Sequence, residues 1–109
     1  MQHPIQILEQ YWNYTSFKPL QEEIINSVLN GDDTFALLPT GGGKSLCFQI
    51  PALINEGICI VVSPLIALMK DQVAALKERN IKAIALTSTY KYDELSMLLD
   101  NCIYGNYKF

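Results

Sequence analysis

The sequence predicts an α/β fold with three layers, in which helices flank a mostly parallel β-sheet. Three short apolar runs, residues 34–38, 58–62 and 83–86, do not alternate with polar residues. Such runs are typical of strands that are covered on both faces of a parallel sheet. Segments with helical spacing alternate with them, which is the element order of such a sheet. Right-handed crossovers are expected to bring the loops that follow the strands to one edge.

Four apolar stripes with a helical period predict the helices of this fold. The first covers residues 20–29 and is expected to end at Asn30-Gly31, because glycine readily adopts the conformation that follows a helix. The second covers residues 46–53 and is expected to bend or end near Pro51. Because the first 31 residues show only helical spacing, they are predicted to form a helical cap ahead of the first strand.

The third stripe covers residues 65–76, and Ser63-Pro64 is predicted to begin this helix with a capping hydroxyl and a first-turn proline. The fourth covers residues 95–102 and runs to a glycine. Residues 107–109 have the character of a fourth strand that has just begun, so we expect a truncated sheet. A native chain end at this point is the alternative. Uncovered apolar edges of a truncated sheet favour self-association.

Composition limits the classes of protein to which the chain can belong. Its 109 residues allow one domain, and with half of them apolar and 17% charged it can bury a core. The net charge of −3 lacks the basic character of proteins that bind nucleic acid by charge alone. No signal peptide or membrane span is evident, so we expect a cytoplasmic protein, associated with the nucleoid if bacterial. Three cysteines are predicted to be small buried side chains rather than a disulfide set or zinc site: Cys47, Cys59 and Cys102.

The glycine-rich segment at residues 39–45 follows a predicted strand and opens a predicted helix. Consecutive glycines let backbone N–H groups turn toward phosphate oxygens, and the helix N-terminus adds partial positive charge. Lys44 is expected to reach the β- and γ-phosphates, and the Ser45 hydroxyl to hold Mg²⁺. The general pattern G-x-x-x-x-G-K-S/T has a glycine where Leu38 stands, so a glycine turn that merely caps a helix is the alternative. The predicted phosphate contacts come from Thr40, Gly41, Gly42, Gly43, Lys44 and Ser45.

Residues 38–52, which read LPTGGGKSLCFQIPA, closely resemble the first helicase motif of RecQ-family DNA helicases. Those enzymes belong to helicase superfamily two, where the first glycine of the general pattern is commonly absent, so Leu38 is ordinary there. The resemblance implies a P-loop NTPase of RecA-like fold. It divides the chain into a helical segment with the adenine motif, residues 1–31, and an incomplete first RecA-like domain, residues 32–109.

The segment before the first predicted strand is similar to the adenine-recognition motif of the same family. By this resemblance, Tyr14 and Lys18 sandwich the adenine ring and Gln21 hydrogen-bonds its edge, which suits a cation, an aromatic ring and an amide. The family usually has arginine where Lys18 stands and glycine where Asn13 stands. An ammonium stacks less well than a guanidinium, so weaker adenine binding is expected. Phe17 is interpreted as a core aromatic residue.

The third predicted helix and the strand before it resemble a motif that contacts single-stranded DNA in this superfamily. Ser63 and Lys70 are the candidates for DNA contact there. Thr87, Ser88 and Thr89 resemble a second DNA-contacting loop, and three hydroxyls suit backbone contacts without base reading. An ordinary amphipathic helix and a polar turn are the alternatives.

Hydrolysis needs carboxylates that hold Mg²⁺ and orient the attacking water. In RecQ helicases these lie in an Asp-Glu-x-His segment, which does not occur in this sequence. We interpret Asp32-Asp33 as turn chemistry, Asp93-Glu94 as first-turn helix charge and His3 as a surface residue.

The resemblance therefore implies the N-terminal part of an ATP-dependent 3′-to-5′ DNA helicase acting in repair and recombination, with ATP and Mg²⁺ as cofactors and DNA as partner. Lys44 is the catalytic candidate, while the 109-residue chain alone is predicted to be inactive. Two alternatives remain at this stage: a P-loop NTPase of another function, and a non-catalytic nucleotide-binding module.

Overall fold

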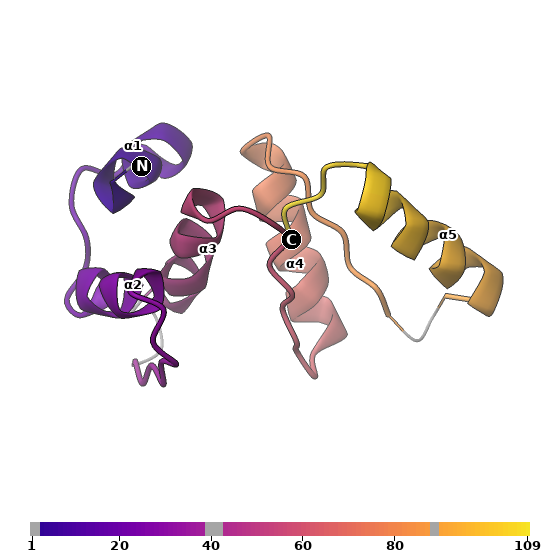
Figure 1. Cartoon of the computed structure of the whole chain (residues 1–109), viewed down its shortest axis with the longest axis horizontal. Helices are drawn as coiled ribbons and strands as arrows, with labels where there is room; N and C mark the ends of the chain where they lie inside the picture. Colours follow the sequence, from indigo (N-terminus) through magenta and orange to yellow (C-terminus); the bar gives the residue numbers. More distant parts are fainter. Residues whose placement is uncertain (1–2, 39–42, 88–89) are drawn as a thin grey trace. The chain divides into compact units, whose positions relative to one another are not determined.

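The computed structural model describes residues 3–38, 43–87 and 90–109. The chain forms two compact units, Met1–Gly57 and Ile58–Phe109. Within the described residues, the first unit contains α1 (Pro4–Trp12), α2 (Gln21–Leu29) and α3 (Lys44–Ile54). The second contains α4 (Ile66–Glu78) and α5 (Tyr92–Tyr104) (Figure 1). The four helices predicted from apolar stripes are confirmed, and α1 adds a helix within the segment predicted to be helical throughout.

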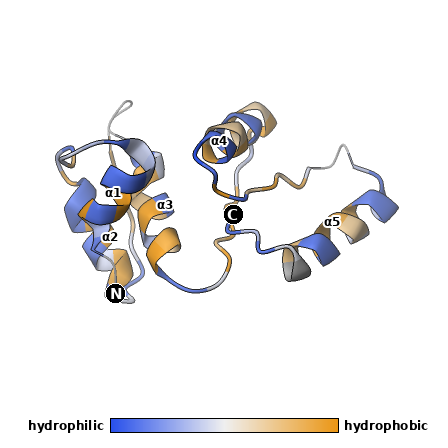
Figure 2. Cartoon of the chain, turned by 90° about the horizontal axis from the view of Figure 1, so that it is seen from above, coloured by the Kyte–Doolittle hydropathy of each residue, from blue (hydrophilic) through white to orange (hydrophobic). Residues whose placement is uncertain are grey.

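The core of the first unit is built where α3 packs against α1 and α2. Its centre consists of four buried aliphatic side chains, Ile7, Leu8, Ile25 and Ile50. Phe17 is partly buried against this cluster, which confirms its interpretation as a core aromatic residue. Figure 2 shows hydrophobic residues along much of α3, which explains why this helix lies at the centre of the packing.

Pro51 does not end the second predicted helix. It lies inside α3, which continues to Ile54. A proline inside a helix removes one backbone hydrogen bond, and tertiary packing can outweigh that loss. Pro51 is fully buried, so burial of the pyrrolidine ring and of neighbouring Ile50 offsets the local cost.

The start of α4 differs from the prediction. Leu65 is its N-cap residue, so Ser63 and Pro64 precede the helix rather than begin it. The Ser63 hydroxyl accepts a hydrogen bond of 3.3 Å from the N–H of Leu65, which forms a local turn just ahead of α4. At the other end of the second unit, Asp93 and Glu94 lie in the first turn of α5, as predicted.

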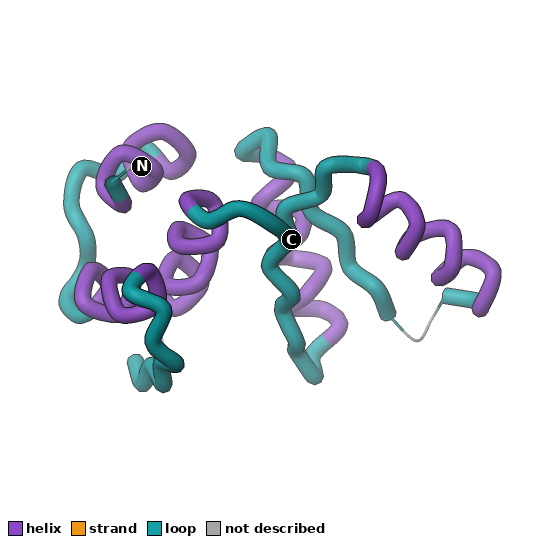
Figure 3. Tube along the Cα trace, viewed as in Figure 1, coloured by secondary structure: helices purple, strands orange, loops and turns teal. Residues whose placement is uncertain are grey.

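The three predicted strands are not strands in the part of the chain that the structure describes (Figure 3). Nor are the first two buried as expected. Phe35 is 91% exposed, and in the second run Ile60 and Val62 are 86% and 92% exposed. A strand requires a hydrogen-bonded neighbour, and among the described residues no backbone hydrogen bond joins residues 35–38 to another segment. The first two runs are therefore loop with exposed apolar side chains, whereas Ala83 in the third run is fully buried.

Residues 107–109 connect the extended segments of the second unit. The N–H of Cys59 donates to the carbonyl of Lys108 at 2.8 Å, and the N–H of Lys108 donates to the carbonyl of Lys82 at 2.9 Å. The N–H of Ile84 donates to the carbonyl of Phe109 at 3.1 Å. The C-terminal residues thus bond to both segments that were predicted as strands in this unit, although no regular ladder forms among the described residues.

No helix in the described ranges combines the length and apolar character that a membrane crossing needs.

Candidate nucleotide-binding site

Gly43 forms the junction between the glycine-rich segment and α3. It is the N-cap residue of α3 and has φ +75° and ψ 42°, a left-handed conformation that favours glycine. Lys44 and Ser45 are the first two residues of the helix, with Lys44 exposed and Ser45 half-buried. Three further predicted phosphate contacts, Thr40, Gly41 and Gly42, lie outside the described residues. The described part of the predicted phosphate loop therefore has the geometry of a glycine turn that opens a helix.

Gln21 joins this glycine to α2. Its side chain is 1% exposed, and its Nε2 donates a hydrogen bond of 3.1 Å to the carbonyl oxygen of Gly43. Its Oε1 accepts a hydrogen bond of 2.8 Å from the backbone N–H of Lys18. Buried polar groups are costly unless they are bonded, and these two bonds satisfy both ends of the amide. Gln21 thus connects the predicted adenine motif with the end of the predicted phosphate loop.

The same contact explains why residue 43 is glycine. A Cβ atom built on Gly43 would collide with Nε2 of Gln21 and would lie 3.8 Å from Cδ of Lys18. Sequence reasoning gave the glycines one role, to let the loop curl around phosphate. It missed this second role, because the approach of Gln21 across 22 positions of sequence has no local signal.

The other two predicted adenine contacts differ in their placement. Lys18 is exposed and lies beside Gly43, so the structure brings Lys18 and Gln21 to the loop together. Tyr14 is 55% exposed and lies on the segment between α1 and α2. The structure therefore gathers an amide and a cation at the start of α3, with an accessible aromatic ring seven residues before Gln21.

Cys47 lies one turn into α3. Its Sγ donates a weak hydrogen bond of 3.8 Å to the carbonyl of Gly43, the acceptor that also receives the Gln21 amide. Burial raises the pKa of the Cys47 thiol, and a hydrogen bond with the backbone of Cys47 itself lowers it to a smaller extent. Burial also raises the pKa of the Cys59 thiol, with a smaller opposing effect from the charge of Lys108. Each of the three cysteines is a free thiol. Cys47 is buried as predicted, whereas Cys59 and Cys102 are only partly buried, so the prediction of burial was wrong for these two.

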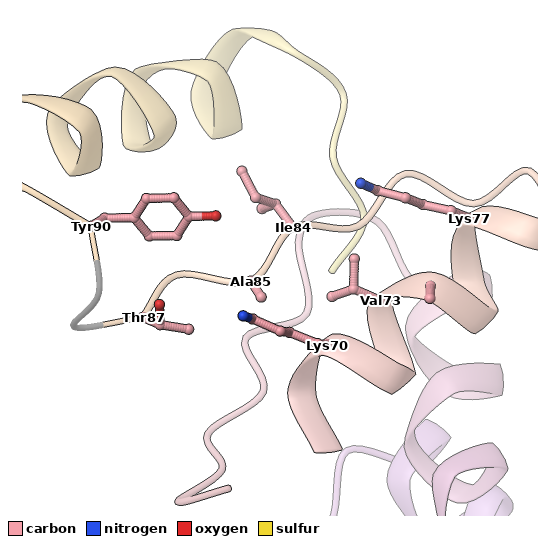
Figure 4. Close-up of a pocket in the computed structure, with 8 residues that line it drawn as sticks. Lys70, Val73, Lys77, Ile84, Ala85, Thr87 and Tyr90 are labelled. Atoms are coloured by element: carbon pink, nitrogen blue, oxygen red, sulfur yellow. The ribbon is translucent and has the colours of Figure 1, made fainter. Parts of the chain in front are cut away.

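The predicted DNA contacts fall in the second unit. Lys70 on α4 and Thr87 in the following extended segment line one pocket (Figure 4). Ser63 does not belong to the described lining of this pocket, and Ser88 and Thr89 lie outside the described residues. The structure therefore brings two of the five candidates together, along with two side chains that the motifs did not single out, Lys77 and Tyr90.

Comparison with known proteins gives one family match and several similar sequences. The family described as DEAD/DEAH box helicase matches residues 18–103. The probable ATP-dependent DNA helicase RecS of Bacillus subtilis is 49% identical over 105 residues, which cover 95% of this chain and 21% of the relative. The ATP-dependent DNA helicase RecQ of Haemophilus influenzae is 43% identical over 104 residues, covering 95% of this chain and 17% of the relative.

The ATP-dependent DNA helicase RecQ of Bacillus subtilis is 47% identical over 103 residues, which are 94% of this chain and 17% of the relative. The similarity therefore runs along nearly the whole chain, which confirms the resemblance drawn from three motifs. The chain spans only about a fifth of the length of these relatives.

Proposed function

The chain belongs to the DEAD/DEAH box helicase family, and from this premise we propose that it is the ATP-binding N-terminal part of an ATP-dependent DNA helicase of the RecQ type. One observation carries the proposal: the bond between Gln21 and Gly43, which joins the adenine motif to the phosphate loop. An ordinary helix-capping glycine has no need of a buried amide from a distant helix. The relatives support the same reading, because each is named as an ATP-dependent or probable ATP-dependent DNA helicase.

The phosphate loop binds the triphosphate in this proposal. Backbone N–H groups at Gly43 and at the start of α3 face the phosphates, together with those of Thr40, Gly41 and Gly42. Lys44, which is exposed at the N-terminus of α3, supplies positive charge to the β- and γ-phosphates. The Ser45 hydroxyl would coordinate Mg²⁺. When bound, this ion neutralises negative charge on the phosphate oxygens.

In this proposal Tyr14 and Lys18 stack on adenine, and the buried Gln21 amide exchanges its bond to Gly43 for one to the edge of the base. Lys18 and Gln21 lie close to Gly43, which supports this assignment. The base and the phosphates belong to one small molecule, so the residues that bind them must be near one another. Lysine in place of the usual arginine makes the stacking contribution small. Affinity is therefore expected to depend more on the phosphates than on the base.

In the longer protein, residues 34–38, 58–62 and 83–86 form strands of a mostly parallel, three-layer RecA-like sheet. Their exposed apolar side chains, such as Phe35 and Val62, support this proposal, since side chains of this kind are normally covered. Residues 1–31 form the adenine-motif segment and residues 32–109 begin the first RecA-like domain. Carboxylates and an arginine for hydrolysis come from the remainder, and the whole enzyme unwinds DNA in the 3′-to-5′ direction during repair and recombination.

Nucleotide binding by the chain tests this proposal most directly. A fluorescent ATP analogue with Mg²⁺ should bind the 109-residue chain, and Lys44→Ala should weaken that binding roughly tenfold or more, because it removes a charge from the phosphate site. The matched control is Lys91→Ala, which removes an exposed lysine just ahead of α5. Equal binding by the Lys44→Ala and Lys91→Ala variants would contradict the phosphate site.

Activity is tested separately. Phosphate release by the 109-residue chain should not exceed that of its Lys44→Ala variant, since the Asp-Glu-x-His carboxylates are not in this sequence. The full-length protein should unwind a duplex with a single-stranded 3′ tail only when ATP is supplied. Nucleotide hydrolysis by the full-length protein without unwinding would favour a P-loop NTPase of another function.

A further inference from the structure

Leu20 has a backbone conformation that residues with a Cβ atom rarely adopt. It is the N-cap residue of α2 and has φ 70° and ψ −15°. Its side chain is 50% exposed, so burial offsets little of the strain. The other non-glycine residues with positive φ in the described part of the chain are all asparagine, which tolerates this region better: Asn13, Asn80 and Asn106. Leucine at this position is therefore the exception.

The strain lies in a tight turn formed by residues 18–21. The N–H of Gln21 donates a hydrogen bond of 3.2 Å to the carbonyl oxygen of Lys18, which closes the turn. Pro19 and Leu20 occupy the two central positions of this turn. Positive φ with ψ near zero at the second central position is typical of a type II turn, which favours proline first and glycine or asparagine second. The sequence thus supplies the proline but has a leucine where the turn favours glycine.

This turn fixes the orientation of the Gln21 side-chain amide. A backbone N–H can only donate, and the N–H of Lys18 bonds to Oε1 of Gln21 at 2.8 Å. A backbone carbonyl can only accept, and that of Gly43 bonds to Nε2 of Gln21 at 3.1 Å. Rotation of the amide by half a turn would mismatch both contacts. The orientation of the amide therefore depends on where the turn holds the N–H of Lys18.

The orientation decides which base the amide can recognise. An amide oxygen has two lone pairs, so Oε1 of Gln21 can accept from a base while it still accepts from Lys18, and Nε2 becomes a free donor once it leaves Gly43. Adenine presents an amino donor beside a ring-nitrogen acceptor, whereas guanine presents two acceptors at the same edge. An amide held in this way matches adenine, because guanine would place a second acceptor against Oε1.

We propose that Leu20 is a positioning residue of the adenine site, and that the strain in its turn limits how well the site selects adenine. A cost of the size expected for a left-handed leucine shifts a conformational equilibrium roughly five- to thirtyfold. Chains in which the turn is open do not present the Gln21 amide to the base, so the apparent affinity falls in proportion to the closed fraction. This inference rests on the proposed function and names a residue that sets its specificity.

Substitution of Leu20 by glycine relieves the strain and tests the inference. We suggest displacing a fluorescent ATP analogue from the 109-residue chain with ATP, GTP or inorganic tripolyphosphate, each with Mg²⁺. Leu20→Gly should tighten ATP binding roughly two- to fivefold and leave tripolyphosphate binding unchanged, because only ATP carries the base that the amide recognises. The preference for ATP over GTP should rise by the same factor. Tm should increase by roughly 2–5 °C as the strain is relieved.

Two further variants separate strain from other effects. Leu20→Ala removes most of the side chain but keeps the Cβ atom that makes positive φ costly, so it should not tighten ATP binding. Asn80→Gly introduces glycine at an exposed left-handed position in the second unit and should leave ATP binding unchanged. In the full-length protein, Leu20→Gly should lower KM for ATP roughly two- to fivefold without changing kcat, since the turn positions the base rather than the reacting phosphate.

Several results would overturn the inference. A higher Tm for Leu20→Gly with an unchanged ratio of ATP to tripolyphosphate affinity would make the turn purely structural. Equal tightening of both ligands would place the effect at the phosphate loop, and equal tightening by Leu20→Ala would assign it to the leucine side chain instead of strain. In these cases ATP binding and its dependence on Lys44 remain, so the nucleotide-binding proposal stands. Failure of the unaltered chain to bind either ligand would instead reject both proposals.

Discussion

The side-chain amide of Gln21, at the start of α2, donates a hydrogen bond of 3.1 Å to the carbonyl oxygen of Gly43, the residue that precedes α3. The contact is buried on the Gln21 side, and no Cβ can be placed on the glycine without collision. Two segments that the sequence suggested for different parts of a nucleotide are therefore held together by the protein itself. The packing of α2 on α3 and the backbone position of Gly43 depend on one another.

Loss of the Gln21 amide should therefore destabilise the first unit. We expect Gln21→Ala to lower the free energy of unfolding by about 1–3 kcal/mol, because it removes both hydrogen bonds of a buried side-chain amide, each of which contributes about 0.5–1.5 kcal/mol. Urea unfolding measured by circular dichroism gives this quantity. Gln10→Ala is the matched control, since Gln10 is exposed on α1 and should change stability by less than about 0.5 kcal/mol. Equal effects of the two substitutions would contradict a structural role for the Gln21 bonds.

Gly43 and Gly31 allow backbone strain to be separated from packing. Both have positive φ, +75° and +85°, but a Cβ at Gly31 meets nothing within 4 Å. Gly31→Ala should cost about 1 kcal/mol from strain alone. Gly43→Ala should cost at least about 1 kcal/mol more, because it also displaces the Gln21 amide. Thermal unfolding of both variants measures the difference, and a smaller loss for Gly43→Ala than for Gly31→Ala would show that the contact is not tight.

The helices were predictable because their signals are local. The apolar stripe of α2 and its end near Asn30 need no knowledge of the rest of the fold, and the structure ends α2 at Leu29. The strands could not be predicted in the same way, because an apolar run such as residues 58–62 becomes a strand only when a neighbouring segment supplies hydrogen-bond partners. In the described residues only scattered bonds do so, among them that from Cys59 to Lys108.

The candidate site shows the same division between local and long-range signals. The glycine-rich segment and Lys44 could be identified by their order in the sequence, and the structure places Lys44 at the N-terminus of a helix as expected. The pocket that Lys70, Lys77 and Tyr90 line could not be identified from the sequence, because it depends on α4 lying against a segment that follows it in the chain. Nothing in the spacing of Lys77 and Tyr90 alone indicates that they are neighbours.

The distribution of burial predicts which apolar residues stabilise this chain. Ile25 is fully buried in the core of the first unit, so Ile25→Ala should lower the free energy of unfolding by about 2–5 kcal/mol. Leu37 is 80% exposed, so Leu37→Ala should change it by less than about 0.5 kcal/mol. Urea unfolding monitored by circular dichroism gives the free energy of unfolding of both variants. A loss above 2 kcal/mol for Leu37→Ala would mean that this segment is covered in solution, either by strand pairing or by self-association.

Cys47 should make the stability of the chain fall at alkaline pH. Burial raises the pKa of its thiol in the folded state, whereas in the unfolded chain the thiol titrates near its ordinary value of about 8.5. Below that pH both states hold the proton, and the stabilising contribution is fully present. As the pH rises further, the unfolded chain loses the proton while the folded chain retains it, so unfolding becomes progressively more favourable up to the folded-state pKa.

Cys47→Ala removes this titration but leaves the lysines and tyrosines unchanged. The difference in free energy of unfolding between the unaltered chain and the Cys47→Ala variant should therefore be constant from about pH 6 to 8 and change in favour of the variant above about pH 8.5. Urea unfolding at each pH measures this difference. A difference that stays constant through about pH 10 would contradict the burial of this thiol.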